Sequence, residues 1–244
     1  PALDALRGAL DDRIVTLAVR PTAAAPAEAG LTPAGAVCDQ ALVLADGRLL
    51  LVTVDDASRR PVDNLASAPL ADLTVDPAAA EVAAGDAATA AFEVAVDEWL
   101  VLTAAAVVGS GSAAVDLGCE YAVERHAFGR PIGAFQAIAH PLADAATELD
   151  GARLLVHEAA WALDTGDARG RELAAMAFAF ACGVGERATY HALHVHGGYG
   201  FMLEYDVQLH YRRARGWPRV WGDAEAGYRR AAAARYPLAE GGRG

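Results

Sequence analysis

Two short segments of the chain carry residue types that can bind a phosphate-containing ligand. They are ERHAFGRPIGAFQAIAH, residues 124–140, and HVHGGYGF, residues 194–201. The guanidinium of Arg125 can neutralise a pyrophosphate with two hydrogen bonds, and the amide of Gln136 can bond a ribose or a base. A glycine run such as residues 197–200 lets backbone N–H groups approach a phosphate or ribose closely. Together the two segments predict a phosphate-and-sugar site.

Each of these residues also has an ordinary structural interpretation. Arg125 can pair with Glu120 or Glu124 on a solvated helix face, and Gln136 can cap a helix. The glycines at 197 and 198 can simply end a helix. The hypothesis that these residues bind a ligand depends on all of them occurring together in this order and spacing.

The elements that must position these segments change character near Asp97. Before it, β-rich runs predict strands over residues 13–19, 36–43, 48–54 and 72–76, with a connector after the first strand and a hairpin turn at Asp46-Gly47. After it, helical spacing predicts three long helices over residues 97–125, 134–164 and 169–196, with shorter helices from about Asp206 and from Asp223. We therefore predict an α+β fold: a small antiparallel β-domain in residues 1–96 and an up-down bundle of four or five helices in residues 97–244.

Small residues gather on one face of the first predicted long helix. They are Ala104, Ala105, Gly109 and Ser112, followed by Asp116. Such a face permits close helix approach and wide contact with another subunit. The pattern predicts an oligomer.

The composition excludes several classes of function. The net charge is −12 and every basic residue is an arginine, with no long basic tract to follow nucleic-acid phosphates. The N-terminus is acidic and has no long apolar run, so we expect neither a signal peptide nor a membrane span, and a cytoplasmic location. Three widely spaced cysteines, Cys38, Cys119 and Cys182, fit no disulfide framework and are expected to be reduced and buried.

A metal site is not expected. The histidines at 191, 194 and 196 are the densest cluster of possible ligands. Their spacing on one helix does not converge, and no carboxylate partner lies nearby in the sequence.

The order of charged, aromatic and glycine positions in the two ligand-binding segments, with the helices around them, resembles the C-terminal half of acyl-CoA dehydrogenases. These are flavin enzymes that desaturate acyl-CoA thioesters. The resemblance implies that Arg125, Phe128 and Gln136 lie on the FAD of a neighbouring subunit, with Phe128 packed on the adenine portion. It also implies cofactor contacts for His194, which takes the place of a family glutamine, and for Gly197, Gly198 and Gly200.

The chain departs from the family in its first half. A typical member has an N-terminal helical domain, a middle β-domain and a C-terminal bundle, and we expect the first of these to be absent. Either the chain is a fragment, or it is a short subunit whose partner completes the acyl pocket. The flavin-binding segment that follows a TEP-like tripeptide in the family is replaced by residues 19–22, with Arg20 at the acidic position and Thr22 left as one donor.

The catalytic base is missing from both positions where the family places it. The reaction needs a carboxylate that takes the α-proton while a hydride leaves the β-carbon for the flavin. The resemblance puts the glutamate of most members at Gly222 and that of a second lineage at Trp99. Glu98 is the one catalytic candidate, but it is out of register by one residue, about 100° around a helix. The alternative role of Glu98 is that of an exposed acid in the first turn of a helix, where it stabilises the helix dipole. Asp223 directly follows Gly222, and its alternative role is that of an N-cap for the last helix.

Three functions remain open. The first is the smaller, degenerate subunit of a heteromeric acyl-CoA dehydrogenase, similar to the heterotetrameric enzymes of actinobacterial steroid side-chain breakdown, acting on a bulky acyl-CoA with FAD shared between subunits. The second is a self-sufficient homo-oligomeric enzyme, of which this chain is a fragment with Glu98 as its base. The third is a flavin-free structural protein that keeps only the fold.

Overall fold

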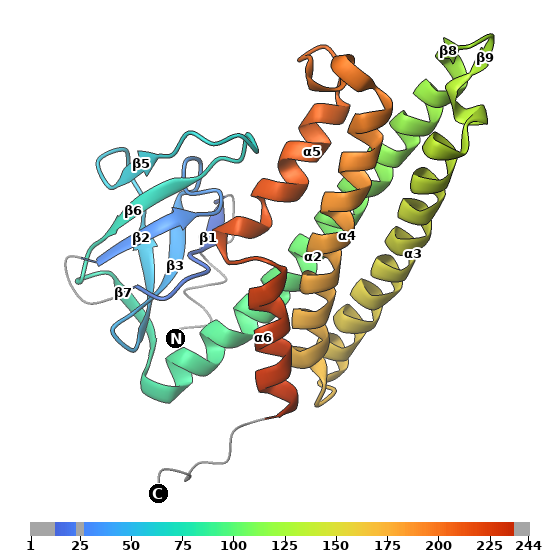
Figure 1. The fold of residues 1–244 in the computed structure, drawn as a ribbon. Helices are drawn as coiled ribbons and strands as arrows, with labels where there is room; N and C mark the ends of the chain where they lie inside the picture. The colour runs from blue at the N-terminus through green and yellow to red at the C-terminus, as the bar shows by residue number, and fades with distance from the viewer. Residues whose placement is uncertain (1–12, 23–26, 237–244) are drawn as a thin grey trace, which may run out of the picture. The chain divides into compact units, whose positions relative to one another are not determined.

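The computed structural model describes residues 13–22 and 27–236 (Figure 1). The chain forms two compact units, Pro1–Val96 and Asp97–Gly244. The first is built from strands and the second from helices. The α+β class and the C-terminal helical bundle predicted from the sequence are confirmed.

The strands of the first unit form two small sheets. One has the order β1 (Val15–Leu17), β3 (Gln40–Ala45), β4 (Arg48–Thr53) and β7 (Ala80–Ala84), and the other has the order β2 (Ala27–Thr32), β6 (Ala71–Val75) and β5 (Arg59–Pro61). Between them lies an apolar core that includes the fully buried Val43, Leu50 and Leu73. Asp46 and Gly47 both have positive φ and close the β3–β4 hairpin, as predicted.

The prediction of a single antiparallel sheet was wrong in two respects. β1 pairs with β3 in parallel, so the larger sheet is mixed. β2, β5 and β7 were not predicted. β5 reads Arg-Arg-Pro, β7 is mostly alanine, and β2 lies where proline and glycine favoured a loop. None of them shows the apolar alternation by which a strand is detected, because each lies at the edge of its sheet or packs only small side chains.

The second unit is a bundle of antiparallel helices (Figure 1). Its helices are the part of α2 (Gly85–Glu124) from Asp97 onward, α3 (Gln136–Thr165), α4 (Gly170–Val195), α5 (Val207–Gly216) and α6 (Ala224–Arg235). α2 begins twelve residues before the predicted start at Asp97. The reason is that buried positions continue upstream at helical spacing, through Ala88, Phe92 and Val96.

The helix ends follow the predicted capping residues. Gly166 is left-handed, with φ 68°, and its N–H bonds the carbonyls of Ala162 and Leu163 at the end of α3. At the start of α6, the carboxylate of Asp223 accepts a hydrogen bond from the N–H of Ala226 at 2.9 Å. The N-cap interpretation of Asp223 is confirmed.

Small residues let α2 approach α4 closely. A Cβ at Gly185 would lie 2.3 Å from the side chain of Val107, and one at Gly118 would lie 3.2 Å from the Cα of Ala192. Both glycines are therefore required by the packing of the bundle.

A buried ion cluster ties three helices together. The carboxylate of Asp97, on α2, is 3% exposed. One oxygen accepts from Nε of Arg171, on α4, at 2.9 Å. The other accepts from Nε and Nη2 of Arg230, on α6, at 3.0 and 2.6 Å. Both oxygens are thus occupied, which makes this acid structural.

Candidate functional site

The two segments predicted to bind a ligand lie at the same end of the bundle. Between α2 and α3 the chain forms the hairpin β8 (His126–Ala127) and β9 (Arg130–Pro131), and α4 is followed by the short helix η2 (Gly197–Phe201). Figure 1 shows the hairpin and the α4–α5 connection at one end of the bundle. The ring of Tyr121, on α2, stacks on His196 with centroids 4.4 Å apart, so the ends of α2 and α4 are packed together.

The hairpin presents an aromatic side chain to solvent. Its turn residues, Phe128 and Gly129, have φ of 52° and 80°. A bulky residue at positive φ is strained, and such strain persists where a site holds it in place. Below the turn, the guanidinium of Arg130 lies 4.4 Å over the ring of Phe135, and the Phe128 ring meets the same ring edge-on at 6.1 Å. Phe128 nevertheless stays 94% exposed.

Arg125 and Gln136 flank this hairpin with free side chains. Both residues are exposed, and the described part of the chain offers neither side chain a hydrogen bond or an ion pair. The alternative pairing of Arg125 with Glu120 or Glu124 is absent within the same residues. α3 is capped at Phe135 with no side-chain bond, so Gln136 does not act as its cap. The two polar groups are available to an external ligand.

The three glycines of the second segment differ in what the fold requires of them. Gly197 has φ 58° and follows the end of α4, which a glycine does readily. A Cβ at Gly200 would lie 2.5 Å from the carbonyl oxygen of Leu193. A Cβ at Gly198 would meet nothing within 4 Å, and its φ lies outside the left-handed range. Of the three, Gly198 is the one at which the described residues impose neither a positive φ nor a contact on an added Cβ.

The two histidines of this segment separate into an exposed and a buried one. His194 is exposed and stacks on Tyr190, with centroids 6.0 Å apart. His196 is buried, and its Nδ1–H donates to the carbonyl of Ala192 at 2.8 Å. His194 therefore faces outward, whereas His196 holds the packing of α2 on α4.

The two positions at which the resemblance places a catalytic base, Trp99 and Gly222, come together in space and hold no acid. Trp99 lies 6.3 Å from the buried ring of Phe178, and that ring packs edge-on against Trp221 at 5.2 Å. Gly222 follows directly, and a Cβ there would lie 2.7 Å from the Cβ of Ala226. An aromatic cluster and a helix thus fill the space that a glutamate would need.

Neither acid near these positions has the environment of a base. Glu98 is exposed on the outer face of α2. Asp223 is bound as a cap, and its backbone bond to Ala226, aided by the charge of Arg219, holds its pKa below the usual value. A carboxylate with a lowered pKa is a poor acceptor for a carbon-bound proton.

Residues 19–22 stand in the place of the segment with which family members bind the flavin of their own subunit. In this structure Thr22 is already hydrogen-bonded within the chain. The hydroxyl of Thr22 donates to the carbonyl of Glu28 at 2.9 Å, and its backbone bridges to Ala45. The donor that the sequence left for a flavin ring is used inside the first unit.

The arginines of α5 and the turn after it are mostly paired with acids or aromatic rings. Glu186 accepts ion pairs from Arg215 at 3.6 Å and Arg219 at 3.3 Å, and Arg213 lies over Trp217. These three side chains are therefore engaged within the chain.

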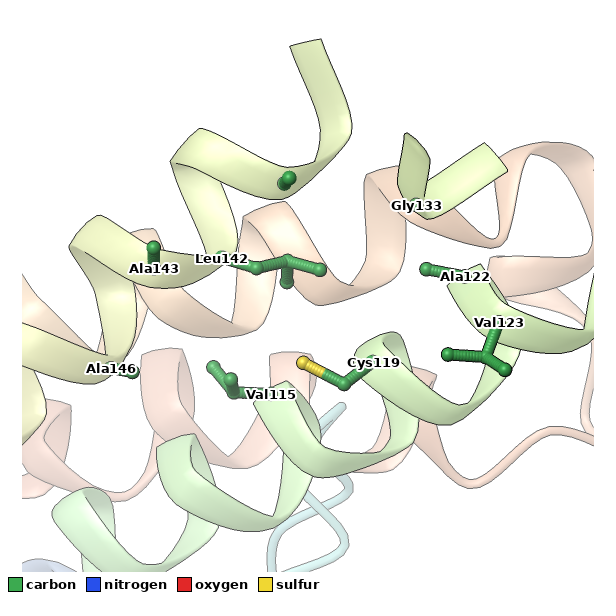
Figure 2. A pocket seen from close by; sticks show the side chains of 9 residues that line it. Val115, Cys119, Ala122, Val123, Gly133, Leu142, Ala143 and Ala146 are labelled. Atoms are coloured by element: carbon green, nitrogen blue, oxygen red, sulfur yellow. The ribbon is translucent and has the colours of Figure 1, made fainter. Parts of the chain in front are cut away.

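A cavity of about 330 Å³ opens below the hairpin, between α2 and α3 (Figure 2). Its lining is apolar and consists of Val115, Cys119, Ala122, Val123, Gly133, Ala139, Leu142, Ala143 and Ala146. Cys119 is exposed, which corrects the prediction that all three cysteines are buried. Partial burial of the sulfur, followed by the charge of Asp116, raises the pKa of its thiol, which lowers the thiolate fraction at neutral pH.

No metal centre is found in the described ranges, 13–22 and 27–236. They contain no group of three or more histidine, cysteine, aspartate or glutamate side chains able to hold an ion.

Comparison with known proteins defines the class. Residues 100–235, more than half of the chain, match the family model for the C-terminal domain of acyl-CoA dehydrogenases. The chain belongs to the acyl-CoA dehydrogenase family, whose members are oxidoreductases and flavoproteins.

Among curated relatives, a probable acyl-CoA dehydrogenase of Bacillus subtilis, YngJ, is 43% identical over 120 residues, 49% of this chain and 31% of its own length. The 3-(aryl)acrylate reductase of Clostridium sporogenes is 42% identical over 112 residues, 46% of this chain and 29% of its own. The acyl-CoA dehydrogenase IpdE2 of Mycolicibacterium smegmatis is 35% identical over 134 residues, 55% of this chain and 41% of its own. The matched part of the chain spans less than half the length of each.

Solved structures confirm the fold over nearly the whole chain. The ChsE4-ChsE5 complex from Mycobacterium tuberculosis superimposes with a TM-score of 0.80 at 24% identity, covering 93% of this chain and 67% of the other. The steroid acyl-CoA dehydrogenase Tcur3481-Tcur3483 gives a TM-score of 0.82 at 24% identity, covering 96% and 70%.

Proposed function

We propose that this chain is the degenerate subunit of a heteromeric acyl-CoA dehydrogenase, which completes the FAD site of a partner subunit and supplies no catalytic base of its own. The observation that carries the proposal is an asymmetry between two regions of the bundle. Arg125, Phe128 and Gln136 stand exposed at one end without hydrogen bonds or ion pairs among the described residues. The two base positions, in contrast, are filled by Trp99, Phe178 and Trp221 and by the contact of Gly222 with Ala226.

The exposed end suits the adenine and pyrophosphate portion of FAD. The chemistry that bound FAD supplies is acceptance of a hydride from the β-carbon of an acyl-CoA. Arg125 would neutralise the pyrophosphate, and Gln136 would bond the sugar or base. Phe128 would cover the adenine, a contact for which its ring is already turned outward. Gly198 leaves room for the ligand to approach the backbone of η2.

The partner is proposed to be a second acyl-CoA dehydrogenase subunit that carries the base and its own flavin segment. The ChsE4-ChsE5 and Tcur3481-Tcur3483 structures, each named for a pair of proteins, support a heteromer. The substrate is proposed to be a bulky acyl-CoA. The steroid enzyme among the structural neighbours is consistent with a substrate of that size.

The test is the FAD stoichiometry of a complex. The chain is co-expressed with the acyl-CoA dehydrogenase encoded beside its gene, and FAD is measured by absorbance for the complex and for the chain alone. One FAD per heterodimer and none on the lone chain support the proposal. One FAD on each lone chain would refute it and favour a self-sufficient enzyme that uses Glu98.

Arg125→Ala separates cofactor binding from folding. Removing a hydrogen-bonded charge forfeits about 1.5–3 kcal/mol, so the complex should bind FAD about 10- to 150-fold more weakly. Arg229→Ala is the matched control, since Arg229 is an exposed arginine on α6 paired with Glu225. Equal FAD affinity in both variants would leave the chain as a structural protein only.

A further inference from the structure

The ring of His196 contacts residues at the base of both segments predicted to bind a ligand. His196 is the C-cap of α4 and directly precedes η2 of the second segment. Its ring stacks on Tyr121 of α2, with centroids 4.4 Å apart and an angle of 27° between the planes. Arg125, of the first segment, follows Tyr121 by one helical turn. One ring therefore joins the end of α4 to the end of α2.

The backbone extends this contact from Tyr121 to Arg125 and the hairpin. The N–H of Arg125 donates to the carbonyl of Tyr121 at 2.9 Å. The carbonyl of Arg125 accepts from the N–H of Ile132 at 2.8 Å, a bond that closes the base of the β8–β9 hairpin. The position of Tyr121 thus sets the position of the Arg125 backbone and of the hairpin that presents Phe128.

The same ring also meets the connection between α4 and α5. Tyr205 approaches it at 5.9 Å with the two planes nearly perpendicular, and Tyr205 in turn packs on Tyr199 of η2 at 5.7 Å. The backbone of η2 is equally close, because a Cβ at Gly200 would lie 3.4 Å from the Cβ of His196. Aromatic contacts and close backbone packing therefore hold η2 against His196.

A buried hydrogen bond fixes the orientation of this ring. His196 is 6% exposed, and its Nδ1 lies 2.8 Å from the carbonyl oxygen of Ala192, one turn earlier on α4. A carbonyl oxygen can only accept, so Nδ1 carries the proton and is already used within the chain. The ring can turn away from Tyr121 only by breaking this bond, which leaves a buried polar group without a partner.

We propose that His196 is a positioning residue: it couples η2 to the base of the β8–β9 hairpin, so that the glycine backbone and Arg125 reach one ligand as a fixed pair. This inference rests on the proposed function, in which that ligand is FAD. Binding to two segments that are already ordered relative to each other avoids the entropy of ordering them at the moment of binding. Loss of the coupling should therefore weaken binding although the Nδ1–H of His196 is spent on Ala192.

The coupling is tested first in the chain alone, by amide hydrogen exchange. His196→Ala removes both the ring and its hydrogen bond, so the amides of Arg125, Ile132 and Met202 should exchange faster together, by about tenfold. The Met202 amide reports on η2, because it donates to the carbonyl of Tyr199 at 3.0 Å. Helical circular dichroism of the variant should match the wild type.

Thr189→Val is the matched control. The buried hydroxyl of Thr189 donates to the carbonyl of Gly185 at 2.7 Å, so this variant also loses a side-chain bond to a carbonyl one turn earlier on α4. It should leave the exchange of the three reporting amides unchanged. His196→Phe keeps an aromatic ring of similar volume and loses only the hydrogen bond, so it should accelerate exchange about threefold and serves in place of His196→Ala if that variant does not fold.

A double-mutant cycle in the complex with the partner subunit tests the consequence for the ligand. His196→Ala should raise the Kd of FAD about tenfold or more, but only about threefold or less when Arg125 is already alanine. The effects are not additive, because His196 acts partly through the placement of Arg125. Thr189→Val should leave the Kd unchanged.

The outcomes separate this proposal from the proposed function. Equal effects of His196→Ala in both backgrounds would give His196 a local structural role and overturn the proposal. Unchanged exchange at Arg125 and Ile132 in the chain alone would overturn it whether or not FAD binds. A complex that binds no FAD would refute the proposed function, and the exchange measurement alone would then decide whether the two segments are coupled.

Discussion

A glycine series in residues 194–201, the second segment predicted to bind a ligand, separates what the fold requires from what a ligand requires. Gly197, Gly198 and Gly200 lie within one four-residue stretch, yet the structure assigns them different constraints. Each is replaced by alanine in the complex with the partner subunit. Thermal unfolding reports the fold, and FAD titration reports the ligand.

The magnitudes follow from the geometry. Gly200→Ala puts a Cβ 2.5 Å from the backbone oxygen of Leu193, and because backbone cannot swing away, we expect a loss of about 3 kcal/mol. Gly197→Ala forces alanine into the left-handed region, at φ 58°, for about 1–2 kcal/mol. Gly198→Ala meets no atom within 4 Å and should be neutral or stabilising by up to about 1 kcal/mol.

The effect of the three variants on FAD binding should follow a different order from their effect on stability. Gly198→Ala should weaken FAD binding at least about tenfold, since the added Cβ holds the ligand away from the η2 backbone by more than a hydrogen bond tolerates. A variant that keeps full FAD affinity would show that nothing approaches this glycine. A drop in stability for Gly198→Ala as large as that for Gly200→Ala would refute the packing argument itself.

Two further predictions concern stability and one concerns reactivity. Asp97→Ala removes the carboxylate that two guanidinium groups share in the buried ion cluster. Urea unfolding should therefore show a free energy of unfolding lower by about 3–5 kcal/mol. A decrease below about 1 kcal/mol would contradict the structural role of Asp97. Burial, followed by the charge of Arg213, lowers the pKa of His210. The unfolded chain therefore binds more protons below the ordinary histidine pKa, and stability should fall on acidification through that window. The His210→Asn variant should lose less stability on acidification than the wild type. An unchanged dependence of stability on pH would contradict the assignment of this effect to His210. Burial raises the pKa of Cys182 to about 12, so alkylation at mildly alkaline pH should modify it only after unfolding.

Local signals were read correctly from the sequence where they act within one helix or one turn. The cap at Asp223, the left-handed Gly166 and the Asp46-Gly47 hairpin depend on neighbouring residues, and each is found in the structure. The start of α2 was misplaced because alanine-rich sequence between residues 85 and 96 lacks the strong contrast of apolar and polar faces. The short strands β5, which reads Arg-Arg-Pro, and β7, which is mostly alanine, were missed because neither shows the apolar alternation of a strand.

The candidate site was predictable in its residue types but not in their surroundings. The motif named Arg125, Phe128 and Gln136 through their order along the chain. Phe128 has a positive φ at the tip of a hairpin and an exposed ring, and Arg130 lies over Phe135 beside it. No spacing rule predicts that arrangement.

The sequence by itself determined the family, the helical bundle and the absence of a glutamate at both base positions, because motifs and periodicity are carried by residues close in the chain. Only the tertiary structure decided that Trp99 and Trp221 meet through Phe178, and that Ala226 occupies the space beside Gly222. It also decided that His196 is buried while His194 is exposed. These facts depend on side chains that are far apart in sequence and brought into contact by helix packing, which a one-dimensional pattern does not encode.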